Sequence, residues 1–445
     1  MNPLNSSPHT GLIAGAAAAD ITPPQPVFLF GYPHVPRTST GVHDALGCSA
    51  LYLGDGEKGT LFLAHDLIFV PRELATEARR RIARETGLAP EAIMLTATHT
   101  HSGPVTADQV CNATDSVVPK TDAGYIAWLC ERVVETAVRA VNRAVPAELG
   151  QAVARWEGVG GNRHDPAGPV DSAVPVLVAR SRETGEWIGC MVVCAMHPTV
   201  LHEDSTLISG DFPHFAREYV RAEALMRGCP FVYHNGASGD QSPRHVTRGN
   251  TFAEAQRIGE LLGRSIVDAI ATMAFTENVG LDARRCWIEL EPRQFPEVAE
   301  AERALQAAHG RYRMLKQSGA TGPRARTAEC DVFGAEETAE LARAANDGRL
   351  ELAIRARTPA EIQAITVGGW ILVGWPGEFF VEYALALREK APGAFLITLA
   401  NGELQGYIVT PAAAANNLYE AGNAVFSPAN GQRFLDATLA LLDGQ

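Results

Sequence analysis

The sequence predicts an α/β protein with a mixed, largely parallel β-sheet core flanked by helices. Two observations predict this class. Short apolar runs of strand length alternate with stretches whose apolar residues recur at helical spacing. Several of the apolar runs also end in His, Ser, Glu or Tyr, as expected where the strands of an open α/β sheet deliver a site at their carboxyl ends.

The first strand-helix-strand unit lies near the N-terminus. The run 60–64 is a buried strand that ends at His65 and Asp66. A helix from about 71 to 85 follows, and Gly87 is expected to end it. The next apolar run leads into His99, so the two strands are expected to pair in parallel and to end at the same edge of the sheet.

The second strand of this unit ends in His-Thr-His. If the backbone stays extended, His99 and His101 point to the same side, and both rings can address one point, such as a metal ion. A pair of hydrogen-bonded histidines at a strand end explains the same pattern equally well. The motif alone therefore leaves both interpretations open.

Later strands repeat this arrangement. The expected strands, each with the residue that follows it, are 187–196 with His197, 231–234 with the turn toward Ser242, 370–373 with Glu378, and 395–399 with Tyr407. Because such strand ends meet at one edge, they outline a single site. The remaining segments are structural: a helix over 122–144 and a helical hairpin at about 296–349, in a chain expected to form one domain from 1 to 445.

Composition excludes several classes of function. The formal charge of −13 argues against a nucleic-acid surface, which needs clustered Lys and Arg. No apolar stretch is long enough to span a membrane, so no stable membrane insertion is expected. The eight cysteines include no Cys-x-x-Cys, and no Lys or Arg precedes the apolar segment 12–19, so reduced thiols and a cytoplasmic location are expected.

The order of the motifs resembles the neutral/alkaline nonlysosomal ceramidase family, over nearly the whole chain. The motifs are Ala19-Asp-Ile-Thr22, Thr98-His-Thr-His-Ser-Gly-Pro104, Asn162-Arg163, the strand ending in His197, Gly239-Asp-Gln-Ser-Pro243, Pro376-Gly-Glu-Phe379, Gly406-Tyr407 and Tyr419-Glu420-Ala421. Each motif is weak by itself, and their order is specific.

The resemblance implies a zinc amidohydrolase related to enzymes that cleave the amide of N-acyl sphingosines. By similarity, the zinc ligands are His99, His197, Glu378 and Tyr407. The residues that line the reacting amide are His101, Arg163 and Tyr419. Ser242 matches a serine that has been considered a nucleophile in the family, and we expect it to position the substrate.

The chemistry of these residue types agrees with the resemblance. Two imidazoles and a carboxylate are a usual ligand set for catalytic zinc and leave a position for the water that attacks the amide. A nearby cation favours the phenolate form of a ligand such as Tyr407. His101 is expected to pass a proton to the leaving amine, and Arg163 and Tyr419 to donate to the developing oxyanion.

The sequence also departs from the family. Gly-Asp-Gln-Ser-Pro-Arg stands at 239–244 where the family has Gly-Asp-Val-Ser-Pro-Asn, and no C-terminal immunoglobulin-like domain is expected after the helix at 431–442. We therefore expect a smaller soluble N-acyl compound as substrate rather than a ceramide of lipid metabolism. The polar loop 105–120 is expected to form part of the pocket wall.

Other functions compete with this prediction. Ser242 suggests an esterase or a serine-nucleophile hydrolase, although Gly236–Asp240 is one residue off the Gly-x-Ser-x-Gly elbow. A metallo-β-lactamase-type site would need Asp and His directly after the His-x-His motif, where Ser-Gly-Pro stands here. A non-catalytic zinc-binding protein is a further alternative, and the sequence leaves homo-oligomer formation open.

Overall fold

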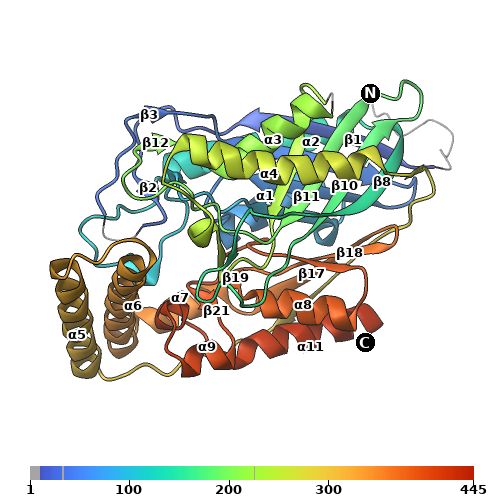
Figure 1. Ribbon diagram of the computed structural model, residues 1–445. Helices are drawn as coiled ribbons and strands as arrows, with labels where there is room; N and C mark the ends of the chain where they lie inside the picture. Colours follow the sequence, from blue (N-terminus) through green and yellow to red (C-terminus); the bar gives the residue numbers. More distant parts are fainter. Residues whose placement is uncertain (1–10, 33–34, 225, 445) are drawn as a thin grey trace.

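Two β-sheets pack face to face in the computed structural model, which describes residues 11–32, 35–224 and 226–444. Helices cover the outer face of each sheet, so the molecule has four layers (Figure 1). The mixed α/β fold class predicted from the sequence is confirmed.

The larger sheet has nine strands. Eight follow one another in the order β13 (Phe231–Asn235), β11 (Trp187–Cys194), β10 (Ala173–Ser181), β8 (Val145–Arg155), β1 (Ile13–Asp20), β4 (Gly47–Gly54), β5 (Gly59–His65) and β6 (Ile93–Ala97). The ninth, β15 (Phe275–Thr276), pairs with β8. The smaller sheet has the order β16 (Leu281–Ile288), β17 (Ala360–Val367), β18 (Trp370–Gly374) and β20 (Ala394–Ile397).

Antiparallel pairs prevail in both sheets, which corrects the expectation of a largely parallel core. Parallel pairing occurs where it was predicted, between β5 and β6, and also between β11 and β13 and between β18 and β20. The other neighbours are antiparallel. Short connections such as those between β4 and β5 or between β10 and β11 reverse the chain without a crossover helix, and this favours hairpins.

The period-two alternation of side chains explains how the layers pack. On β5, Leu61 and Leu63 face the helices, whereas Phe62 and Ala64 face the smaller sheet. Both sets are buried, so the strand is apolar throughout. Burying a Leu or Phe side chain contributes roughly 1.5–3 kcal/mol, which makes the contact between the sheets a main source of stability.

Six helices complete the outer layers. The larger sheet is covered by α1 (Arg72–Thr86), α2 (Ala123–Asn142), α3 (Phe212–Glu223) and α4 (Phe252–Ala271), and the smaller sheet by α8 (Val381–Lys390) and α11 (Ala429–Asp443). As predicted, α1 ends at Gly87, whose φ of 79° closes the helix in the left-handed conformation.

A helical pair lies beside these layers at one end of the molecule (Figure 1). It consists of α5 (Val298–Gln317) and α6 (Gly322–Asp347), and α7 (Arg349–Arg357) follows. Only a short turn joins α5 to α6, because α6 already begins at Gly322. A proline in the first turn of α6 does not interrupt the helix, because the backbone N–H that proline lacks would have no partner within the helix at that position.

All eight cysteines are unpaired thiols. In the part of the chain that the structure describes, no helix combines the length and apolar character needed to cross a bilayer.

Candidate metal and active site

Three ligand atoms converge at the end of the sheets. The Nε2 atoms of His99 and His197 lie 3.1 Å apart, and each lies 3.1 Å from Oε2 of Glu378. Donors about 2.1 Å from a tetrahedral zinc are separated by about 3.4 Å, so this spacing nearly matches the edge of a zinc tetrahedron. The residues therefore fit a metal ion.

Backbone carbonyls fix the tautomers of both imidazoles. The Nδ1 atom of His99 donates to the carbonyl of Ile68 at 2.9 Å, and that of His197 donates to the carbonyl of Ser238 at 2.6 Å. A neutral ring that donates from Nδ1 presents a lone pair at Nε2. Burial lowers the pKa of His197 to about 4, which keeps its ring neutral near pH 7. Two lone pairs and a carboxylate oxygen thus face one point, and a cation satisfies all three.

The carboxylate of Glu378 is held in its charged form. Burial alone would raise its pKa, whereas a proton on Nε2 of His99 or His197, or a cation in its place, holds the pKa of this carboxyl well below its usual range. The side chain is 7% exposed. An anionic oxygen is therefore available to a cation in a largely enclosed environment.

The backbone at His99 differs from the extended conformation that the sequence suggested. Strand β6 ends at Ala97, and His99 has a φ of 72°, in the left-handed region that non-glycine residues rarely adopt. The rings of His99 and His101 nevertheless meet, with centroids 4.9 Å apart and an interplanar angle of 87°. Such a conformation is unfavourable and persists only where the surrounding structure holds it in place. Residues of this kind are often found at functional sites.

His101 completes a group of three histidines. One ligand nitrogen from each of His99, His101 and His197 lies within 4.8 Å of the others. Both ring nitrogens of His101 lack a hydrogen-bond partner, and its pKa is well below the usual range because of burial and the two neighbouring imidazoles. Gly31 packs against this ring, where a Cβ would lie 2.5 Å from the imidazole. His101 is thus a neutral imidazole with both nitrogens unengaged.

Two short strands bring Glu378 and Tyr407 together. Strand β19 (Glu378–Phe379) follows β18, and β21 (Tyr407–Ile408) follows β20. The two strands pair in parallel with Glu378 opposite Tyr407. The rings of Tyr407 and His197 have centroids 6.4 Å apart. The four predicted zinc ligands therefore come from separate segments and gather in one place.

The Gly-Asp-Gln-Ser-Pro segment serves as a structural junction. Asp240 accepts hydrogen bonds from the side chain of Asn162 at 2.7 Å and from the backbone N–H of Val381 at 2.9 Å. The backbone N–H of His197 bonds to the carbonyl of Gln241 at 3.2 Å. This segment thus connects the chain around His197 to the strand that carries Glu378.

Ser242 belongs to that junction and does not line the cavity beside the histidines. It lies in β14 (Gln241–Ser242), which pairs with β9 (Gly161–Asn162), and its Oγ accepts from the backbone N–H of Arg244 at 3.3 Å. In the described structure the side chain acts as a cap. This geometry favours neither a nucleophilic role nor direct substrate contact.

Arg163 lies against two aromatic rings and a buried carboxylate. Its guanidinium is 5.3 Å from the ring centre of Tyr407 and 5.7 Å from that of Tyr419, and it forms an ion pair with Glu420. Glu420 is fully buried and also accepts from Nε2 of His164 at 2.7 Å. Although burial opposes the charge, Arg163 and His164 lower the pKa of Glu420 to about 2.

The phenol of Tyr407 lies beside the guanidinium of Arg163. Burial and the nearby Glu378 raise the pKa of Tyr407 well above its ordinary value, while Arg163 opposes that shift. A bound cation would favour the phenolate further. Arg163 is not among the residues that line the cavity, so its contacts position Tyr407 and Tyr419.

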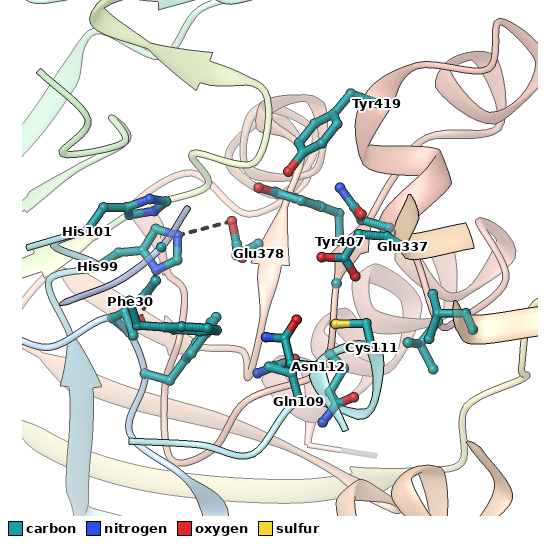
Figure 2. A pocket seen from close by; sticks show the side chains of 18 residues that line it. Phe30, His99, His101, Gln109, Cys111, Asn112, Glu337, Glu378, Tyr407 and Tyr419 are labelled. Carbon is teal, nitrogen blue, oxygen red and sulfur yellow. Dashed lines mark hydrogen bonds and ion pairs between the residues drawn. The ribbon is translucent and has the colours of Figure 1, made fainter. Parts of the chain in front are cut away.

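A small cavity of about 90 Å³ lies beside the histidines. Figure 2 shows His99, His101 and Glu378 on one side of it, with Tyr407 and Tyr419 from the C-terminal part of the chain nearby. Gln109, Cys111 and Asn112 line it from the loop 105–120, as the sequence analysis predicted. His101, the predicted catalytic group, thus borders both the predicted metal ligands and the cavity.

Sequence reasoning missed several residues of this site. Glu420 and His164 were not assigned roles, although each directly follows a motif residue that was. Glu337 reaches the cavity from α6, and no local pattern signals it, because that helix was interpreted only as part of a hairpin. His65 and Asp66 are not part of this site. His65 donates a hydrogen bond to the carbonyl of Thr96, and Asp66 forms an ion pair with Arg217.

Part of the chain is similar to a known enzyme family. Residues 12–154 match the model of the family "Neutral/alkaline non-lysosomal ceramidase, N-terminal". The resemblance to this ceramidase family is confirmed. The family match covers the part of the chain that holds His99 and His101. Solved structures of ceramidases have a similar fold over the rest of the chain as well.

Two solved ceramidases share the fold of this ceramidase-like chain. A ceramidase "complexed with C2" has a TM-score of 0.74 at 18% identity, covering 98% of this chain and 76% of the other. The neutral ceramidase from Pseudomonas aeruginosa has a TM-score of 0.72 at 18% identity, covering 97% of this chain and 74% of the other. At this identity the likeness establishes the fold alone.

Proposed function

We propose that this protein is a zinc-dependent amidohydrolase that cleaves a linear N-acyl amide. One observation carries the proposal: the Nε2 lone pairs of His99 and His197 and the carboxylate of Glu378 converge within 3.1 Å of one another. The ceramidase-like fold and family resemblance support hydrolysis of an amide as the reaction.

The residues take the following roles in the proposal. Zinc would be held by His99, His197 and Glu378, with Tyr407 as the fourth protein ligand. When bound, zinc supplies Lewis acidity toward the amide carbonyl and activates water at neutral pH. His101, whose ring nitrogens are unengaged, moves a proton to the leaving nitrogen. Tyr419 lines the cavity and donates a hydrogen bond to the developing oxyanion, while Arg163 positions both tyrosines.

We propose a small soluble N-acyl compound as the substrate. A cavity of about 90 Å³ is below the roughly 300–1,000 Å³ of typical ligand pockets, and far below what two long hydrocarbon chains need. The formal charge of −13 also disfavours approach to an anionic membrane surface.

Metal analysis tests the centre of the proposal. We expect about one zinc per purified chain and close to none in His197→Ala, because that substitution removes one of three convergent ligands. His309→Ala is the matched control, since His309 lies on α5 with its side chain 44% exposed. A wild-type protein that is fully active without metal would refute the assignment.

Substrate size is tested by kinetics. We expect kcat/KM for short-chain N-acyl amides to exceed that for a long-chain ceramide in detergent by at least about tenfold, because a cavity of about 90 Å³ is too small for the lipid chains. Ester analogues of the same length test the esterase alternative. Faster turnover of the long-chain ceramide would contradict the proposed substrate class and leave the zinc assignment intact.

A further inference from the structure

The cavity beside the histidines has two chemically different walls. Near His99 it is apolar and is formed by Phe30, Ile68 and Phe69. Elsewhere its lining includes the apolar Leu341 and Val425 and the amide of Gln405, which is hydrogen-bonded to backbone groups of Asp108 and Val110. Four further polar side chains, which we call the polar wall, are Gln109, Asn112, Glu337 and Asn423. Figure 2 labels three of them, Gln109, Asn112 and Glu337, away from His99 and His101.

The polar wall contains unpaired hydrogen-bonding atoms. Nε2 of Gln109, Oδ1 of Asn112 and Oδ1 of Asn423 have no partner, and these residues are only 8%, 7% and 7% exposed. Buried polar groups are almost always hydrogen-bonded, because leaving them unpaired costs stability. Three such atoms bordering one cavity indicate that a ligand group completes them.

Glu337 adds a carboxylate to this wall. It projects from α6, is 9% exposed, and contacts the thiol of Cys111 on the turn that also carries Asn112. Burial and this carboxylate raise the pKa of Cys111 well above its usual range, so the thiol stays protonated. The wall as a whole therefore presents mainly acceptor oxygens, from Asn112, Asn423 and Glu337.

We propose that the polar wall binds a hydrogen-bond-donating group of the substrate, an ammonium or a hydroxyl, at a distance from the amide that is cleaved. This inference rests on the proposed amidohydrolase function and specifies its substrate class. Glu337 is the specificity-determining residue, because its carboxylate favours an ammonium over a hydroxyl and both over a methyl group.

The other substrate chemistries fit this wall less well. A hydrocarbon chain would leave the amides of Gln109, Asn112 and Asn423 without partners in an enclosed space. A terminal carboxylate would face the side chain of Glu337 and be repelled by it. A group that donates hydrogen bonds satisfies the acceptor oxygens directly.

Two sets of matched amides test the proposal by kcat/KM. The first set consists of N-butanoyl amides of diaminopropane, aminopropanol and butylamine, which end in an ammonium, a hydroxyl or a methyl group. The second places the same three end groups on the acyl part of propylamides. We expect the donor-bearing compounds of at least one set to exceed the methyl compound by about tenfold or more, since a hydrogen bond to a charged group discriminates by that order.

Variants of the wall make the test specific. Glu337→Gln should remove the preference in kcat/KM for the ammonium compound over the hydroxyl compound. Glu337→Leu should remove the preference for both of these compounds over the methyl compound. Asn112→Leu, on a different segment, should weaken the donor preference in the same direction. Glu336→Gln is the matched control on α6, since Glu336 is not among the residues that line the cavity. It should leave all ratios unchanged.

Binding gives a readout that does not depend on turnover. Calorimetry of the same amides on His101→Ala should reproduce the order ammonium, hydroxyl, methyl, and the added Glu337→Gln substitution should remove the ammonium preference. If amides bind in this order but none is hydrolysed by the wild type, the proposed function fails and the polar-wall assignment stands. If the amides are hydrolysed with no preference among end groups, or Glu337→Gln changes no ratio, the polar-wall assignment is overturned and the hydrolase stands.

Discussion

At the scale of single residues, two backbone carbonyls decide which atoms the histidines present to the site. The carbonyls of Ile68 and Ser238 accept the Nδ1 protons of His99 and His197, and so direct both Nε2 lone pairs toward Glu378. His101 lacks such a partner on either nitrogen. In the proposed function, this difference separates two imidazoles that would bind the metal from one that is free to transfer a proton.

The first prediction concerns His101. His101→Ala should keep about one zinc per chain and lower kcat by about 10²-fold or more, because a proton-transfer group acts mainly in the transition state. Metal content and steady-state kinetics measure both effects. Loss of zinc from this variant would instead show that the three-histidine group, and not the pair with Glu378, holds the ion.

The second prediction concerns the buried ion pair of Arg163 and Glu420. Glu420→Gln should lower the free energy of unfolding by about 3 kcal/mol near pH 7, because it leaves a buried guanidinium without its counter-charge. Glu77→Gln, which breaks an exposed pair with Arg80, should have no measurable effect. Denaturant unfolding compares the two variants.

The pH dependence of that difference follows from the pKa of Glu420. Its value of about 2 in the folded protein is below the ordinary value of 4.5, so its ionised form stabilises the fold above about pH 4.5. The stabilisation is lost as the pH falls from 4.5 through about 2. The difference between wild type and Glu420→Gln should therefore shrink over this range, and a difference that is constant below pH 4.5 would contradict the assignment.

At the scale of elements, the pairing of β19 with β21 brings a carboxylate and a phenol into register. Glu378 lies directly opposite Tyr407. The turn before β21 contains Gly406, with a φ of 68°, and a Cβ there would lie 1.8 Å from the carbonyl oxygen of Asn423. Only glycine allows this approach, and it sets the position of Tyr407 relative to the ligands.

The third prediction tests that turn. Gly406→Ala should destabilise the fold by at least about 2 kcal/mol and weaken zinc retention, because it adds a steric overlap to an unfavourable backbone conformation. Gly280→Ala is the control, since nothing lies within 4 Å of a Cβ at Gly280. Unfolding curves and zinc content are the measurements, and equal behaviour of the two variants would show that the close approach is unimportant.

At the scale of the whole molecule, the site joins the two sheets. His99 follows β6 and His197 follows β11, both in the larger sheet, whereas Glu378 and Tyr407 follow β18 and β20 of the smaller sheet. The proposed ion would therefore link the ends of two layers whose contact is mainly apolar. Binding to such a site stabilises the folded state as a whole.

The fourth prediction follows from this arrangement. Chelation of the metal should lower the Tm by at least about 4 °C, because an ion held at 1,000 times its Kd contributes about 4 kcal/mol to stability. His99→Ala should already show the lower Tm and should not respond to chelator. Thermal unfolding with and without chelator measures this, and an equal response in wild type and variant would contradict a metal that bridges the sheets.

The sequence by itself determined the local elements and the residue types of the site. Periodicity predicted α1 with its stop at Gly87 and the parallel pair of β5 and β6, and the motif order indicated which side chains would gather at one candidate site. Both kinds of signal are local, because they depend on spacing along the chain.

Tertiary structure decided what depends on contacts between distant segments. The antiparallel interior of the sheets, the left-handed backbone at His99 and the capping role of Ser242 arise from pairing and packing that no single segment encodes. The same holds for Glu337, which reaches the cavity only because α6 packs against the turn that carries Cys111 and Asn112. Such long-range contacts leave no periodic signal, because the free energy that selects them comes from the assembled core.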